Sequence, residues 1–256
     1  MPLWRCISCE AEERSQTEPS RCVCGVESSW ALVSEGSRSG RERPARSVRL
    51  ASLRADELER VSSGEPALDK LLGGGWVLGY SALVHGPGGA GKSRLVYRWA
   101  SRLAPCLVVG LEMDARLTLE TARGAGADVG GMRYWPSPGG WRAEADRVRA
   151  RSVVIDSVSE VGQGAARMAR ELRDWCHEGA RFGWSIAHTN KRGAVLGSTD
   201  LQHAPDYFAK VSPLGKDRCR LRFPKSRFCG RGSVVLSLVG TKATVELAQE
   251  LGGGEC

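Results

Sequence analysis

The sequence predicts an α/β protein in which a mainly parallel sheet is flanked by helices and a small cysteine-bearing unit comes first. Three observations predict it: strand-like and helical runs alternate, a glycine-rich loop joins a strand-like run to a helical one, and four cysteines lie close together near the N-terminus. Such alternation is typical of βαβ units, whose parallel strands are covered on both faces. A chain of 256 residues, 41% hydrophobic and 26% charged, can form one large domain and a small appendage.

The charge balance indicates a polyanionic partner. The net charge is +8, although 29 acidic residues accompany the 37 basic ones and a solvated basic surface is the alternative. No apolar run approaches the roughly 18 residues of a transmembrane helix, and the first residues lack the apolar core of a signal peptide. We therefore expect a cytoplasmic protein without a membrane partner, whose nine cysteines are metal ligands or free thiols rather than disulfides.

The four N-terminal cysteines have metal-ligand spacing. Cys6-x-x-Cys9 and Cys22-x-Cys24 are separated by twelve residues, in a segment (residues 1–32) too short for a hydrophobic core. Four thiolates around a tetrahedral Zn²⁺ would supply the missing folding energy. The second pair is one residue closer than in the common CxxC, so four thiols in a flexible tail are the alternative. We predict a zinc site, then a linker over 33–49 of small and charged residues.

The large domain is expected over residues 50–248, with a glycine-rich disordered tail over 249–256. Ser81–His85 is a short apolar run that predicts a strand. After the glycine loop, residues 94–103 carry Leu95, Val96, Trp99 and Leu103 at helical spacing. The other elements expected are strands over 106–110, 152–155 and 183–187, a helix over 165–179, and an antiparallel edge hairpin over 234–239 and 243–247.

The glycine-rich loop fits GxxxxGK[ST] at every fixed position. Its residues are Gly86, Pro87, Gly88, Gly89, Ala90, Gly91, Lys92 and Ser93. Small residues let backbone N–H groups surround a triphosphate, while Lys92 reaches the β- and γ-phosphates and Ser93 binds Mg²⁺. The following helix adds the positive end of its dipole. The alternative, a chance glycine-rich turn, is disfavoured by the flanking strand and helix, so we predict binding of ATP with Mg²⁺.

Three polar residues follow predicted strands. Asp156 ends the apolar run Val153–Ile155 and is expected near Mg²⁺ and Ser93, the alternative being an ordinary strand-end turn. Glu112 follows the strand over 106–110, where it would polarise an attacking water, but Asp114 or a surface role would fit as well. His188 would sense the γ-phosphate or simply be a polar residue at a strand end.

Several blocks, in order, resemble the bacterial RadA/Sms family, RecA-superfamily ATPases of recombinational repair. The cysteine unit with Trp30 resembles its zinc ribbon, and Lys225-Ser-Arg227-Phe228-Cys-Gly230 resembles its KNRFG signature. The other blocks are residues 60–75, the phosphate loop, Val154-Ile-Asp-Ser157, and His188-Thr-Asn-Lys-Arg-Gly193 with Leu201, His203 and Asp206 in step. Together the blocks cover roughly residues 1–247.

The resemblance implies a RecA-like P-loop ATPase core that assembles into a ring, expected to be a homo-hexamer, with ATP held between neighbours. It implies Glu112 as the water-activating carboxylate. It also implies that Lys225 and Arg227 are a basic pair that reaches the ATP phosphates of a neighbouring subunit, whereas Lys92 acts on the ATP of its own subunit. A basic edge loop is the alternative for Lys225 and Arg227. The loops over 157–165 and 189–202 would face the channel, where Lys191 and Arg192 would bind single-stranded DNA without sequence preference.

The function implied is an ATP-dependent motor in strand exchange or branch migration during DNA repair, with a recombinase or replication protein as a further partner. Two departures from the family are visible. The family carries a C-terminal domain resembling the Lon protease, which we do not expect in a chain that stops at Cys256. The signature has Ser226 in place of Asn and an inserted Cys229. A KaiC-like switch with a protein partner and a non-hydrolysing zinc-ribbon adaptor are the alternative functions.

Overall fold

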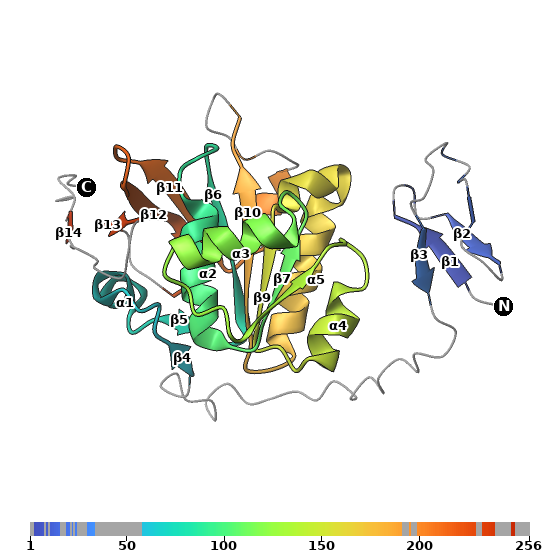
Figure 1. Cartoon of the computed structure of the whole chain (residues 1–256), viewed down its shortest axis with the longest axis horizontal. Helices are drawn as coiled ribbons and strands as arrows, with labels where there is room; N and C mark the ends of the chain where they lie inside the picture. Colours follow the sequence, from blue (N-terminus) through green and yellow to red (C-terminus); the bar gives the residue numbers. More distant parts are fainter. Residues whose placement is uncertain are drawn as a thin grey trace, which may run out of the picture. The chain divides into compact units, whose positions relative to one another are not determined.

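A computed structural model describes residues 3–7, 9, 11–15, 19–20, 22, 24, 30–33, 58–190, 195, 199–228, 232–238 and 247–248 (Figure 1). The chain divides into two compact units, Met1–Leu58 and Glu59–Cys256. The predicted linker beyond residue 33, the predicted start of the large domain at residue 50 and the predicted tail over 249–256 lie outside the described residues, so these boundaries remain predictions.

The first unit contains a three-stranded antiparallel sheet of order β2-β1-β3. Its strands are β1 (Leu3–Cys6), β2 (Glu12–Arg14) and β3 (Trp30–Val33). The Trp4 indole donates a hydrogen bond to the Ser15 carbonyl at 3.1 Å, and Arg5 pairs with Glu12 across the two strands. Strands this short bury little apolar surface, so the sheet depends on further cross-links.

The second unit is built on a nine-stranded sheet of order β14-β13-β12-β11-β6-β10-β9-β7-β8 (Figure 1). Five of its eight neighbouring pairs are parallel and the three at the β14 side are antiparallel. The strands are β6 (Tyr80–Gly86), β7 (Cys106–Gly110), β8 (Met132–Trp135), β9 (Ser152–Asp156), β10 (Phe182–His188), β11 (Tyr207–Pro213), β12 (Arg218–Ser226), β13 (Ser233–Ser237) and β14 (Leu247–Ala248). A two-stranded ribbon pairs β4 (Arg60–Val61) with β5 (Trp76–Val77).

Helices cover both faces of this sheet. They are α1 (Pro66–Leu72), α2 (Lys92–Ala100), α3 (Ala115–Gly124), α4 (Trp141–Arg147) and α5 (Ala165–His177), with short 3₁₀ turns η3 (Ser101–Leu103), η4 (Val158–Gly164) and η5 (Thr199–Gln202). Alternate strand residues enter two separate cores: Val84 packs with α2, whereas its neighbour Leu83 packs with α5. The predicted α/β class, with a mainly parallel sheet flanked by helices, is confirmed.

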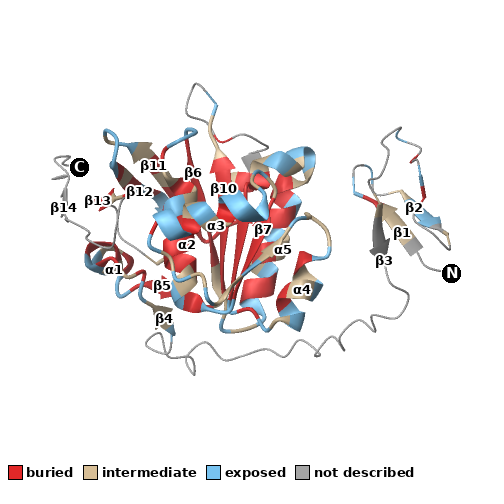
Figure 2. Ribbon diagram, in the orientation of Figure 1, coloured by how far each residue is buried: buried red, intermediate tan, exposed pale blue. Residues whose placement is uncertain are grey.

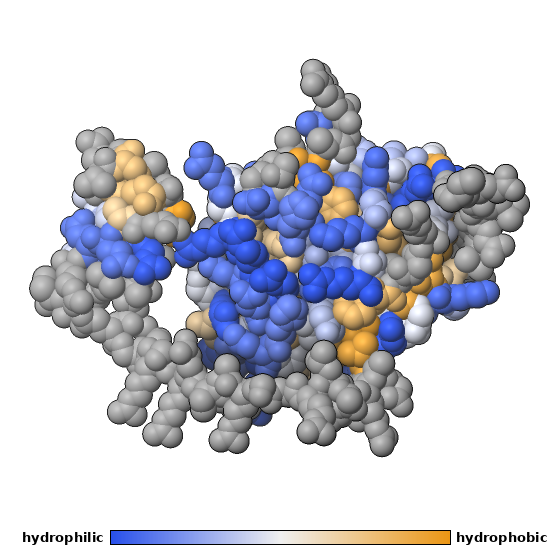
Figure 3. Space-filling model, turned by 180° about the vertical axis from the view of Figure 1, so that it is seen from behind, coloured by the Kyte–Doolittle hydropathy of each residue, from blue (hydrophilic) through white to orange (hydrophobic). Residues whose placement is uncertain are grey.

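The central strands are buried, as Figure 2 shows. Hydrophilic side chains dominate the rear of the second unit, with apolar ones in limited patches (Figure 3). None of the helices in the described part of the chain is long and apolar enough to cross a membrane.

An aromatic cluster ties the segment before the phosphate loop to the sheet. The ring of Trp76, on β5, is fully buried. It lies between 5.2 and 6.2 Å from the rings of Trp99, Phe182, Trp184, Tyr207 and Phe223. Since deleting a buried aromatic side chain costs about 3–5 kcal/mol, this cluster holds β5 firmly against α2 and the strands β10, β11 and β12.

The strands expected over 81–85, 106–110, 152–155 and 183–187 correspond to β6, β7, β9 and β10. The helix expected over 94–103 begins two residues earlier and changes to a 3₁₀ turn at Ser101. The expected edge hairpin is represented by β13 paired antiparallel with β14, while residues 239–246 lie outside the described part. The structure adds β11 and β12 between β6 and β13, which the sequence patterns did not predict.

Candidate nucleotide site

The phosphate loop joins the carboxyl end of β6 to the first turn of α2. The Lys92 ammonium donates hydrogen bonds to the carbonyls of Gly86 at 3.0 Å and Pro87 at 2.9 Å, so it bends back over the loop. Gly91 has φ +86°, and a Cβ there would lie 2.4 Å from the Leu238 side chain, so glycine is required. A Cβ on Gly88 or Gly89 would meet nothing within 4 Å, which leaves this side of the loop open to a ligand.

Asp156 ends β9 and is 1% exposed. Its Oδ2 accepts a hydrogen bond from the Tyr97 hydroxyl at 2.6 Å, whereas Oδ1, also buried, accepts none from the residues that the structure describes. Burial raises the pKa of Asp156, while hydrogen bonds from Tyr97 and Ser93 oppose the rise. A buried carboxylate oxygen without a partner, beside the Ser93 hydroxyl, fits a hard cation such as Mg²⁺.

Lys92 is also buried, and this burial lowers its pKa. The negative charges of Asp156 and Glu112 act in the opposite direction and favour its charged form. The predicted phosphate-binding lysine therefore lies within the field of both predicted carboxylates.

Glu112 and His188 meet at the same edge of the sheet. The His188 Nε2 and the Glu112 Oε2 are 2.9 Å apart. The backbone N–H of Glu112 donates to the Asp156 carbonyl at 3.2 Å, because β7 and β9 are adjacent. The Ser159 hydroxyl, on η4, accepts the backbone N–H of His188 at 3.0 Å. The structure thus brings together Lys92, Ser93, Asp156, Glu112 and His188 around the carboxyl ends of four strands.

Asp114, the alternative to Glu112, has a different contact. Its carboxylate accepts the backbone N–H of Leu117 at 2.8 Å and caps the N-terminus of α3. Satisfying an otherwise unpaired helix N–H is an ordinary structural use of aspartate. Of the two acidic residues, Glu112 is therefore the one whose carboxylate contacts another residue of the site, His188.

Lys225 and Arg227 are not brought to the loop of their own chain. Lys225 lies opposite Phe208, which in turn lies opposite Leu83 in the middle of β6. The backbone N–H of Arg227 donates to the carbonyl of Asp206 at 3.3 Å, next to the start of β6. Both basic side chains are exposed, and the Arg227 Nε lies 3.7 Å from the buried Asp206 carboxylate. Lys225 is therefore level with the middle of β6, and Arg227 is near the end of β6 that is opposite to the phosphate loop.

Lys191 and Arg192, the predicted DNA-binding residues, lie outside the described residues. The described ends of their loop are close together, since Thr189 forms an isolated antiparallel bridge with Val195. The loop begins directly after His188 of the nucleotide site.

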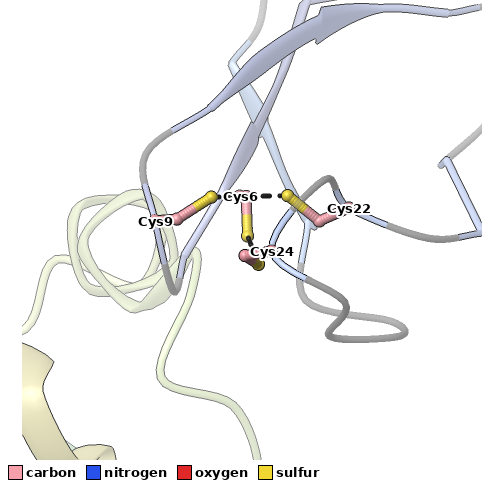
Figure 4. A group of neighbouring side chains, drawn as sticks. All are labelled: Cys6, Cys9, Cys22 and Cys24. Atoms are coloured by element: carbon pink, nitrogen blue, oxygen red, sulfur yellow. Dashed lines mark hydrogen bonds between the residues drawn. The ribbon is translucent and has the colours of Figure 1, made fainter.

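The cysteine cluster of the first unit is shown in Figure 4. The ligand atoms of Cys6, Cys9, Cys22 and Cys24 all lie within 4.8 Å of one another. The Cys6 and Cys24 sulfurs are 3.8 Å apart and the Cys9 and Cys22 sulfurs 3.4 Å, and all four are free of disulfides. A tetrahedron of Zn–S bonds of about 2.3 Å separates its sulfurs by about 3.8 Å, so the cluster fits Zn²⁺.

The crowding of the thiols supports this fit. The pKa of Cys22 is raised to about 12: the backbone N–H of Cys24 lowers it, but burial and the thiols of Cys9, Cys6 and Cys24 outweigh that effect. Without a cation, such a thiol keeps its proton, and metal binding would release it.

Sequence reasoning missed two buried residues beside the nucleotide site. Tyr97 contacts Asp156, and His85, directly before the loop, stacks on Phe208 with ring centroids 4.4 Å apart. The spacing of Tyr97, four residues after Ser93 on one helix face, is the signal that could have found it. No sequence signal pointed to His85, because its position in a buried strand before the loop does not require a particular residue type.

No protein-family model matches the chain. It is similar to the curated DNA repair protein RadA of Haemophilus influenzae, with 28% identity over 204 residues, which is 73% of this chain and 44% of that protein. RadA of Pseudomonas aeruginosa is 28% identical over 196 residues (70% and 43%), and RadA of Escherichia coli 27% over 201 residues (72% and 44%). The chain therefore spans less than half the length of these relatives. The resemblance predicted from its motifs is confirmed: the chain is similar to the bacterial DNA repair protein RadA.

Proposed function

We propose that this protein is an ATP-hydrolysing, DNA-binding protein of the RadA type that acts in recombination and DNA repair. The observation that carries the proposal is the meeting of Lys92, Ser93, Asp156 and Glu112 at the open side of a GxxxxGK[ST] loop. A phosphate site alone binds nucleotide, whereas a second carboxylate beside it supports hydrolysis. The similarity to proteins named DNA repair protein RadA directs the proposal toward DNA.

Each residue of the site has a separate role in the proposed hydrolysis of ATP. The loop amides and Lys92 would bind the phosphates, and Ser93 and Asp156 would hold Mg²⁺, whose charge would offset that of the phosphates. Glu112 would orient the attacking water and accept its proton. The water oxygen bonds to the γ-phosphorus as the bond to the bridging oxygen breaks, which releases ADP and phosphate, and Glu112 then returns the proton to bulk water. His188 holds one oxygen of the Glu112 carboxylate and so sets its orientation.

The proposal includes a ring, in which Lys225 and Arg227 act on the ATP of a neighbouring copy. Their position supports an action between subunits, because the register puts them away from the loop of their own chain. Exposed cations reaching the transferring phosphoryl group would stabilise its developing charge. A homo-hexamer is the assembly that the resemblance implies.

The proposed DNA contact is the loop from Thr189 to Gln202, with Lys191 and Arg192 as its cations. This loop starts one residue after His188, which contacts Glu112. DNA bound to the loop would thus change turnover through the position of Glu112. Single-stranded DNA, in strand exchange or branch migration, is the substrate proposed.

The test is ATP turnover by the full chain with and without single-stranded DNA, alongside the mass of the assembly with ATP. We expect turnover to rise with DNA, the rise to shrink steeply as salt is increased, and the mass to correspond to several copies. Lys92→Ala is the control and should lose nucleotide binding. Turnover that stays the same over a wide range of DNA concentrations would contradict the DNA-dependent function, and ATP binding without turnover would contradict the hydrolase.

A further inference from the structure

Tyr97 carries a hydroxyl into the nucleotide site from the interior of the protein. It lies on α2, four residues after Ser93, and its side chain is fully buried. Residues four apart lie on the same helix face. One face of α2 therefore presents two hydroxyl groups to Asp156, that of Ser93 at the loop and that of Tyr97 one turn further along.

The Tyr97 contact is short and directional. Its hydroxyl donates to the Oδ2 of Asp156 at 2.6 Å, the length typical of a hydrogen bond to a carboxylate. A phenol carries an O–H at neutral pH and a carboxylate oxygen can only accept, so Tyr97 is the donor in this contact. Oδ1 of the same carboxylate accepts no hydrogen bond from the described residues.

We infer that Tyr97 is a positioning residue for the Mg²⁺ site, an inference that rests on the proposed function. By occupying Oδ2, Tyr97 fixes the plane of the carboxylate and leaves Oδ1 as the oxygen for Mg²⁺ or for a water bound to it. Groups that orient a metal-binding carboxylate in this way commonly account for about 10–100-fold in metal affinity. Without the phenol, the carboxylate is free to turn about its last side-chain bond.

A purely structural role for Tyr97 would have a different signature. The ring packs in the same core as Trp99 and Val154, so removal of its hydroxyl would lower stability whatever the hydroxyl does. Stability alone therefore does not separate the two roles. The dependence of nucleotide binding on Mg²⁺ does, because only a positioning residue affects the metal.

The experiment compares Tyr97→Phe with Tyr207→Phe in the full chain. Tyr207 is a matched control: it is fully buried in the same core, and its hydroxyl accepts the backbone N–H of Val77 at 3.2 Å rather than facing the nucleotide site. The measurement is binding of a fluorescent, non-hydrolysable ATP analogue in EDTA and over a series of Mg²⁺ concentrations, with thermal unfolding of each variant.

We expect Tyr97→Phe to need about 10–100-fold more Mg²⁺ for the same tightening of binding, with binding in EDTA changed less than about twofold. Tyr207→Phe should keep the native Mg²⁺ dependence at a similar loss of thermal stability. If the two variants share one Mg²⁺ dependence while the native chain responds to Mg²⁺, the inference is wrong and the proposed function stands. If the native chain does not respond to Mg²⁺ at all, the proposed function itself fails.

A second comparison tests the route through Asp156. Asp156→Asn should weaken the Mg²⁺ response without abolishing it, and adding Tyr97→Phe should weaken it no further, because both changes act on one contact. Losses that simply add would show that Tyr97 acts independently of Asp156, which contradicts the inference.

Discussion

The first unit combines three strands of three or four residues with a cluster of four cysteine sulfurs, whereas the second unit surrounds the buried ring of Trp76 with five aromatic rings. The described residues of the first unit form only short strands with little apolar surface to bury, so a metal held by the four thiols would add the stability that a core does not supply. The second gains enough from burial to place charged groups such as Lys92 and Asp156 inside. The spacing of four cysteines along the chain is therefore enough to define the cluster of the first unit. The nucleotide site of the second unit needs a large hydrophobic core to position its buried charged residues.

The largest expected effect comes from removing the metal. A strong chelator, or Cys22→Ser, should unfold the first unit, because apparent zinc-binding free energies of about 10–16 kcal/mol are folding free energies in such sites. Hydrogen–deuterium exchange of the full chain should show lost protection over the described parts of residues 3–33 and unchanged protection in β6, β9 and β10. Cys219→Ala, outside the cluster, is the control. Unchanged protection of the first unit after chelation would mean that the thiols hold no structural metal.

The next effect concerns the choice between two acidic residues in the second unit. Glu112→Gln should reduce ATP turnover about 10²–10⁴-fold while ATP binding persists, because the amide keeps the shape of the carboxylate but not its charge. Asp114→Asn is the matched control, and it should keep turnover while weakening the cap of α3 by no more than about 1 kcal/mol. If Glu112→Gln keeps the native rate of ATP turnover, Glu112 has no role in hydrolysis.

A smaller effect comes from the buried imidazole of His85. Burial, assisted by the charges of Lys210 and Lys92, lowers its pKa from 6.5 to about 4, so the folded chain holds it neutral. The unfolded chain binds this proton below about pH 6.5, and stability therefore falls as the pH drops from about 6.5 to 4. The loss is at most about 3 kcal/mol for a shift of this size.

His85→Phe should reduce this dependence, since phenylalanine has no titratable group and can stack on Phe208 in the same way. Urea unfolding at pH 7 and pH 5 measures the difference between the native chain and the variant. An identical pH dependence in both would show that His85 is not held neutral, and that the second unit tolerates a buried charge there.

The parts of the molecule that could be predicted from the sequence are those that depend on residues close together in the chain. Lys92 and Ser93 follow from the GxxxxGK[ST] pattern, because the loop, the helix N-terminus and both side chains come from eight consecutive residues. Asp156 follows from its place after an apolar strand. The strands β6, β7, β9 and β10 follow from their apolar runs, since strands of a parallel sheet are buried on both faces.

Other parts depend on contacts between distant segments. Glu112 and Asp114 lie two residues apart and match one sequence pattern, yet only the fold pairs Glu112 with His188 and uses Asp114 as a helix cap. β12 carries alternating basic and apolar residues, which predict a strand only once β11 and β13 lie beside it. Lys225 and Arg227 match a family signature, but only the register of β12 on β11 and of β11 on β6 shows that they lie away from the phosphate loop of their own chain.

By itself, the sequence determined the α/β class, the phosphate loop and the cysteine cluster, because each depends on short-range spacing or on the periodic burial of one segment. Tertiary structure alone decided that Tyr97 contacts Asp156, that His188 contacts Glu112 and that Oδ1 of Asp156 accepts no hydrogen bond from the described residues. The physical reason is that the hydrogen bonds of a buried carboxylate are set by groups up to 59 residues away in the chain. Only the packing of α2 on the sheet and the pairing of β10 within it bring those groups within reach.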